Sequence, residues 1–115
     1  MFTLPNGARR APDAFWITKE KYYALSQEER ENRFARIAPD FVIELMSKSD
    51  NLRKLQAKMR EYIENGSRLG WLINLNQKKV HVYRANDDIK SMENPSCVSG
   101  EDVLLGFELN LTDIW

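Results

Sequence analysis

A single acidic residue interrupts the most apolar stretch of the chain. Residues 41–46 (FVIELM) are apolar apart from Glu44. The length of this stretch and its lack of polar alternation predict a β-strand that is buried on both faces. An ionised carboxylate in such a strand costs several kcal/mol unless a cation or strong hydrogen-bond donors meet it. The fold must therefore bring a partner to Glu44.

A second acidic residue, Asp13, opens another apolar run, which predicts a strand over residues 13–17. Asp40 is closer in sequence, but it lies about 13 Å from Glu44 along the same strand. That is too far for both carboxylates to hold one Mg²⁺ ion, whose oxygen ligands lie at about 2.0–2.1 Å. Neighbouring strands lie only about 4.8 Å apart. We therefore expect Asp13, and not Asp40, to converge on Glu44, provided that the two strands pair in matching register.

Turn and capping signals divide the rest of the chain into alternating strands and helices. Short helices are predicted after Thr18 and Ser26, and a long amphipathic helix is predicted from a cap at residues 49–51 to Gly66. The other predicted strands cover residues 2–4, 69–75, 79–83, 88–92 and 107–111, and a turn covers 112–115. This order predicts one domain, residues 1–115, of the α/β (mixed α+β) class, with a central mixed sheet flanked by helices.

The composition is that of an ordinary soluble domain, with 43% hydrophobic and 30% charged residues. The formal net charge is zero, so a nucleic-acid site would have to be a local concentration of positive charge. The lone Cys97 cannot form an intramolecular disulfide, which favours a reducing compartment. No apolar stretch approaches the roughly 20 residues of a membrane span, and no secretory signal is visible. We expect a cytoplasmic protein without a membrane partner.

A lysine on the long helix is the best candidate to reach the two acids. At about 100° per residue, Lys58 lies about 90° from the centre of the apolar stripe, whereas Lys54 lies about 130° away. A lysine beside a metal-bound phosphodiester orients the attacking water or neutralises developing charge. Structural alternatives are open: Glu44 pairs with Arg53 or Lys58, and Lys58 is a surface lysine whose stem covers apolar side chains. Asp13 alone, after a proline, is more often structural than catalytic.

A basic cluster of four residues lies close to Asp13 in sequence. Its members are Arg9, Arg10, Lys19 and Lys21. The cluster either contacts phosphates, which position a nucleic acid without reading its sequence, or is a solvated surface.

Three ring-bearing residues are not assigned to the site. His81 should face outward with Lys79 and Tyr83, and we expect it to be neither a ligand nor a base. Trp16 and Trp71 are expected in the core and not as base-stacking platforms. No glycine-rich phosphate loop, zinc-ligand spacing or serine-triad signature is present.

A set of short motifs runs along the chain at residues 4–8, 11–13, 38–45, Ser47, 58–62, Gly66, 70–73 and 100–104. Taken together, these motifs resemble those of the Uma family of restriction-endonuclease-like proteins, a bacterial branch of the PD-(D/E)XK nuclease-like fold. The resemblance covers essentially the whole chain. The resemblance implies a restriction-endonuclease-like central mixed sheet flanked by helices and a DNA substrate.

The resemblance also implies Mg²⁺-dependent cleavage of phosphodiester bonds, with Mn²⁺ as a possible substitute. Asp13 and Glu44 match the first and second acids, and the backbone carbonyl of Leu45 would complete the metal ligands with water. The superfamily motif has a lysine at the position of Met46, but in this branch the lysine position matches Lys58. Lys48 is a rival lysine, at a position where the family usually has proline.

Family members normally carry further N-terminal structure, with a preceding strand and a helix that presents an acidic residue to the site. This chain starts after them. An uncovered sheet edge favours association, so we expect a homodimer. Three functions stay open on this basis. The first is a metal-dependent DNA endonuclease, active or inactive in this short form. The alternative is a non-catalytic nuclease-fold protein that acts as a binding or oligomerisation module, and the third is a purely structural or interaction role.

Overall fold

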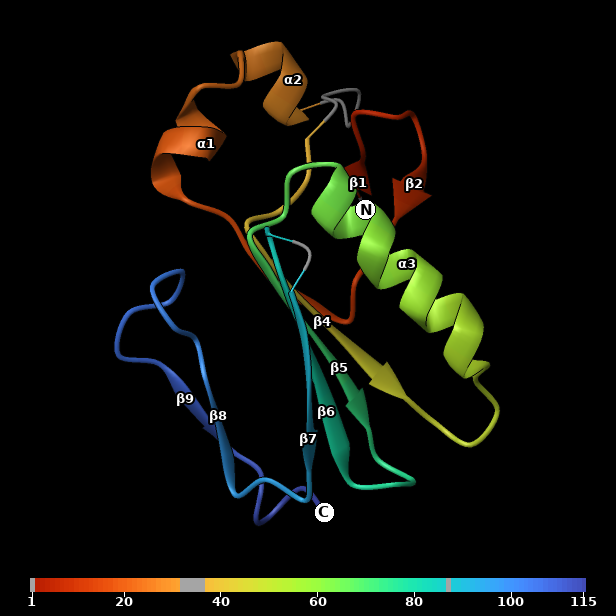
Figure 1. The fold of residues 1–115 in the computed structure, drawn as a ribbon. Coiled ribbons are helices and arrows are strands. Elements are labelled where there is room, and N and C mark those ends of the chain that lie inside the picture. Colours follow the sequence, from red (N-terminus) through yellow and green to blue (C-terminus); the bar gives the residue numbers. More distant parts are fainter. Residues whose placement is uncertain (1, 32–36, 87) are drawn as a thin grey trace.

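A five-stranded mixed sheet forms the centre of the computed structural model, which describes residues 2–31, 37–86 and 88–115 (Figure 1). Its strands lie in the order β3 (Ala14–Trp16), β4 (Phe41–Met46), β5 (Leu69–Asn74), β6 (Lys79–Arg84) and β7 (Ile89–Glu93). Strands β4 and β5 run parallel, and the other neighbours run antiparallel. Two further pairs form separate two-stranded sheets: β1 (Phe2–Thr3) with β2 (Arg9–Arg10), and β8 (Cys97–Ser99) with β9 (Glu108–Asn110). The helices are α1 (Lys19–Tyr23), α2 (Gln27–Glu31) and α3 (Leu52–Glu64). The mixed sheet and its helices confirm the predicted fold class.

The two faces of the sheet carry separate hydrophobic cores. Helix α3 and the β1–β2 hairpin lie over one face, and the β8–β9 hairpin lies over the other (Figure 1). Successive residues of a strand point to opposite faces, so each central strand contributes to both cores. The core under α3 contains Leu4, Ala38, Val42, Met59, Tyr62, Leu72 and Tyr83. The opposite core contains Phe41, Leu69, Trp71, Ile73, Val80, Val82, Val98, Val103 and Leu111.

Helix α3 packs closely on the sheet and carries two residues of the site described below. Its N-terminus is capped by Asn51, whose side-chain oxygen accepts the backbone N–H of Lys54 at 3.2 Å. Met59 is fully buried against the sheet. Gly70 on β5 permits this approach, because a Cβ atom there would lie 2.6 Å from Cε of Met59 and 3.0 Å from a methyl of Val42. The predicted helix is confirmed, with Asn51 as the cap.

The two short helices also begin where the sequence predicts. Thr18 caps α1, and Ser26 and Glu29 exchange reciprocal hydrogen bonds of 3.1 Å at the start of α2. Asp40 links α1 to the start of β4, because its Oδ2 accepts the N–H of Thr18 at 2.9 Å. Its Oδ1 lies 3.9 Å from Nζ of Lys21. Asp40 therefore has a structural role at the opposite end of β4 from Met46.

The strand predicted at residues 107–111 is present as β9, and it pairs with β8, a strand that the weak pattern around Cys97 did not reveal. Two other predictions about the periphery of the sheet are wrong. Trp16 is 39% exposed, because it lies on the edge strand β3. Tyr83 is buried, because α3 covers the face toward which it points. Trp71 is fully buried, as predicted.

Within the described ranges, no helix is both long enough and apolar enough to cross a membrane.

Candidate active site

Asp13 directly precedes β3 and lies beside the part of β4 that carries Glu44. In the antiparallel β3–β4 ladder Ala14 pairs with Ile43, so Asp13 and Glu44 are the next two residues in the same register. The carboxylate of Asp13 is fixed at this point, because its Oδ2 accepts the backbone N–H of Leu45 at 2.7 Å. Asp13 is exposed, whereas Glu44 is only 3% exposed. The matching register expected for these two strands is therefore the one that the fold adopts.

The two donors that reach Glu44 both bind one of its two oxygens. Nζ of Lys58 lies 3.0 Å from Oε1, and the buried hydroxyl of Tyr62 donates to the same oxygen at 3.3 Å. Lys58 and Tyr62 are four residues apart on α3 and so share one side of the helix. No hydrogen bond from the described residues reaches Oε2 of Glu44. One carboxylate oxygen is thus held by the helix and the other is available.

Burial dominates the electrostatics of Glu44. Desolvation raises the pKa of Glu44, the hydrogen bond and charge of Lys58 lower it in part, and the nearby negative charge of Asp13 raises it again. Desolvation and the adjacent Glu44 also raise the pKa of Tyr62, so its hydroxyl keeps its proton at neutral pH. Lys58 therefore offsets part of the cost of ionising Glu44, and a bound cation would stabilise the two acids further.

The backbone N–H and carbonyl of Leu45 point toward the edge of β4 beside which Asp13 lies. The N–H of Leu75 donates to the carbonyl of Met46 at 3.4 Å, which directs the backbone groups of Met46 toward β5. Backbone groups of successive strand residues point in opposite directions within the sheet, so those of Leu45 point toward β3. Its N–H is the group that Asp13 accepts. The carbonyl of Leu45 consequently lies on the open side of β4, beyond the start of β3.

This donor set fits a hard divalent cation that keeps much of its water shell. Asp13, Oε2 of Glu44 and the Leu45 carbonyl offer oxygen ligands of the kind that Mg²⁺ prefers. No group of three or more His, Cys, Asp or Glu side chains converges within residues 2–31, 37–86 and 88–115. Two carboxylates and one carbonyl leave positions that only water or substrate oxygens can fill, as is usual for Mg²⁺.

The structure brings together the four residues that the sequence and the family resemblance select, and it separates them from Asp40, which the sequence rejects. Asp13, Glu44, Leu45 and Lys58 meet at one point, whereas Asp40 is engaged elsewhere. Tyr62 is missed, because the sequence places it only on the apolar stripe of the helix. The signal that could have identified it is its spacing, one helical turn after Lys58 on the stripe that faces Glu44.

Comparison with known families agrees with this arrangement. The family described as "Uma2: Putative restriction endonuclease" matches residues 1–112. The chain belongs to this family. No curated protein matches the chain.

A solved structure extends the likeness to three dimensions. The chain is similar to a protein from Anabaena variabilis described as a "putative nuclease belonging to DUF820", with 26% sequence identity and a TM-score of 0.60. The match covers 68% of this chain and 44% of the other chain, so this chain spans less than half of that protein's length. Both comparisons support a nuclease fold, and the restriction-endonuclease-like family generally uses divalent metal ions.

Proposed function

We propose that residues 1–115 form one nuclease-like domain that hydrolyses phosphodiester bonds of DNA with the help of Mg²⁺ or Mn²⁺. The observation that carries the proposal is the asymmetry at Glu44. Lys58 and Tyr62 occupy Oε1, while Oε2 is left beside Asp13 in a site where burial disfavours an unpaired charge. Lys58 and Tyr62 engage only Oε1, so Oε2 is available to bind a cation.

Each residue has a separate task in this proposal. Asp13, Glu44 and the Leu45 carbonyl would hold the ion, which supplies Lewis-acid stabilisation of charge on the phosphodiester and activation of water. Tyr62 fixes the orientation of the Glu44 carboxylate through its 3.3 Å hydrogen bond. Lys58, 26% exposed at its side chain, can reach both Glu44 and a phosphate oxygen or an attacking water. The half-exposed lysine thus connects the buried acid to the substrate side.

A matched pair of acid-to-amide variants tests the proposal. We expect Asp13→Asn to lower the rate of Mg²⁺-dependent cleavage of plasmid DNA by about 100-fold or more, because it removes a charged ligand. Asp40→Asn removes a carboxylate from the other end of β4 and should leave cleavage within about threefold of wild type after correction for folded fraction. Equal loss in both variants, or intact DNA after prolonged incubation of the wild-type chain with either ion, would overturn the proposal.

We also propose that two copies of the chain pair along β3. This strand is an edge of the main sheet, its three residues are exposed, and Phe15 is 53% exposed. An edge with unpaired backbone groups is complementary to a second copy of itself related by twofold symmetry.

In sedimentation velocity we expect the wild-type chain to be a dimer and Phe15→Lys to be a monomer, because the introduced charges would face each other across the symmetric edge. Ile89→Lys is the matched control, since Ile89 is 43% exposed on the opposite edge strand β7. A wild-type chain that sediments as a monomer at micromolar concentration contradicts the paired edge.

One observation favours the second candidate function, a non-catalytic nuclease-fold binding module. The direct 3.0 Å pair between Lys58 and Glu44 gives the buried acid a partner without any metal ion. A glutamate with a purely structural role would also have one oxygen paired with a lysine, as Oε1 of Glu44 has. The two functions differ in metal binding, which the non-catalytic module lacks and which calorimetry with Mn²⁺ measures directly.

A further inference from the structure

A cleft of about 560 Å³ opens between the N-terminal hairpin and helix α3. Its lining residues come from β2 and the segment that follows it, and from the exposed side of α3. They are Arg9, Arg10, Ala11, Lys54, Ala57, Lys58 and Glu61. Four of these residues are basic and one is acidic, although the chain as a whole has no net charge. The cleft is therefore a local concentration of positive charge.

Two of the four cations are already committed to acidic partners. Nε of Arg10 lies 2.6 Å from Oε1 of Glu61, and Lys58 is paired with Glu44. Arg9 and Lys54 are exposed and have no acidic partner within the described parts of the chain. Their positive charge is consequently available to an anion from solution, which does not first have to displace a carboxylate.

The cleft is continuous with the candidate active site. Lys58 lines the cleft and also contacts Oε1 of Glu44, so an anion that occupies the cleft lies next to the carboxylate pair. Ala11, which also lines the cleft, lies two residues before Asp13. Among the described residues, the apolar lining consists of two alanines, which gives the cleft little capacity to recognise a ligand by shape.

We propose that this cleft binds the phosphodiester backbone of the nucleic acid next to the bond that is cleaved, with Arg9 and Lys54 as phosphate-contacting residues. The inference rests on the proposed function and deepens it by naming the surface along which the substrate lies. Contacts from arginine and lysine to phosphates fix the position of a nucleic acid without reading its bases. Binding in the cleft is therefore independent of sequence and sensitive to salt.

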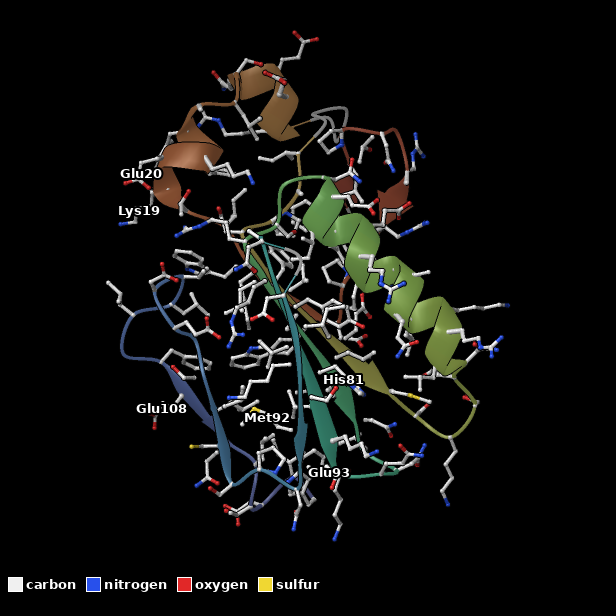
Figure 2. The ribbon with its side chains drawn as sticks, in the orientation of Figure 1. Lys19, Glu20, His81, Met92, Glu93 and Glu108 are labelled. Carbon is white, nitrogen blue, oxygen red and sulfur yellow. The ribbon has the colours of Figure 1, made fainter. Side chains whose placement is uncertain are left out.

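Only part of the basic cluster proposed from the sequence lines the cleft. Arg9 and Arg10 line the cleft, whereas Lys21 lies near Asp40 at 3.9 Å. Figure 2 shows Lys19 on α1, well apart from α3. Lys19 is exposed and is close to Arg9 in sequence only. It therefore provides a matched control for the removal of one positive charge outside the cleft.

The test is binding of a fluorescent 20-base-pair DNA duplex, followed by anisotropy in EDTA so that cleavage plays no part. Loss of one phosphate contact reduces the slope of log affinity against log salt by about 0.9. We expect Arg9→Gln and Lys54→Gln each to bind more weakly than wild type at about 50 mM salt. Their deficit should shrink by about 3.5-fold when salt rises to about 200 mM. Lys19→Gln should match wild type in affinity and slope.

Three outcomes would overturn the cleft as the binding surface. The first is a slope of log affinity against log salt in Arg9→Gln and Lys54→Gln that equals the wild-type slope. The second is a loss of DNA affinity in Lys19→Gln as large as that in the two cleft variants. If either result accompanies normal Mg²⁺-dependent cleavage by the wild-type chain, only the cleft is wrong and the proposed function stands. Absence of both duplex binding and cleavage in the wild-type chain would count against the cleft and the proposed function together.

Discussion

Replacing Glu44 with glutamine is expected to lower Mg²⁺-dependent DNA cleavage by about 1000-fold. A bound divalent ion contributes several kcal/mol of charge stabilisation, and each 1.36 kcal/mol corresponds to a tenfold change in rate. Glutamine keeps the shape of Glu44 and can still accept the hydrogen bonds of Lys58 and Tyr62 at one oxygen. It removes the negative charge beside Asp13. The rate is measured by plasmid nicking at saturating Mg²⁺, with Asp40→Asn as the control for loss of a buried carboxylate.

The same substitution should make the metal-free protein more stable at neutral pH. Because the pKa of Glu44 is raised in the folded chain, the folded state binds its proton more tightly than the unfolded state does. The stability contributed by Glu44 is therefore complete below its ordinary pKa and is lost as pH rises through the raised value. Thermal unfolding in EDTA should show that the advantage of Glu44→Gln over wild type grows from about pH 4 to about pH 8.

Two results would contradict this account of Glu44. Cleavage by Glu44→Gln within tenfold of the wild-type rate would show that the carboxylate is not needed for the reaction. A glutamine variant that becomes less stable than wild type as pH rises would show that Lys58 more than compensates for burial. In that case Glu44 would be a satisfied structural acid.

Replacing Lys58 with methionine is expected to reduce cleavage by about 100- to 1000-fold and to destabilise the fold. The loss of rate is that expected for one preorganised donor at the reacting group. The loss of stability, about 1–3 kcal/mol at neutral pH, arises because Glu44 is left buried without its cation. Glu44 then takes up a proton more readily, so the destabilisation should diminish as pH falls. Denaturant unfolding at two pH values measures this effect.

Lys90→Met is the matched control for this substitution. Lys90 is exposed on the edge strand β7, and its replacement removes the same charge and adds the same side chain. Lys90→Met should leave the rate of cleavage unchanged. It should change the free energy of unfolding by no more than about 0.5 kcal/mol. If Lys58→Met is equally harmless, the lysine is a solvated surface residue and the 3.0 Å pair has no energetic role.

The part of the fold that positions the site could be predicted because its signals are local and strong. A run of six residues, five of them apolar, predicts β4, and the asparagine cap and apolar stripe predict α3. Strand spacing rejects Asp40 and selects Asp13, and helix geometry selects Lys58. The structure brings these residues together in a register that the sequence permits but does not determine. The resemblance to the Uma family led to the same residues from the motifs.

Features that depend on contacts between distant segments could not be predicted. Tyr83 is in an alternating strand, and nothing in that strand shows that α3 covers its second face. The β8–β9 hairpin has short strands, and only its position over the second core explains why Val98 and Leu111 are buried. The cleft could not be predicted for the same reason. Arg9 and Lys54 are 45 residues apart in sequence, and they line one cleft only because the β1–β2 hairpin lies beside α3.

Titration of Mn²⁺ into the metal-free chain, followed by isothermal calorimetry, is the most direct test of the central claim that Asp13 and Glu44 hold a divalent ion. We expect one ion per chain in the wild-type protein and in Asp40→Asn. We expect at least tenfold weaker binding in Asp13→Asn and Glu44→Gln, which each lose a charged ligand. Absence of binding in the wild-type chain, or equal binding in all four proteins, would show that Asp13 and Glu44 do not hold a divalent ion.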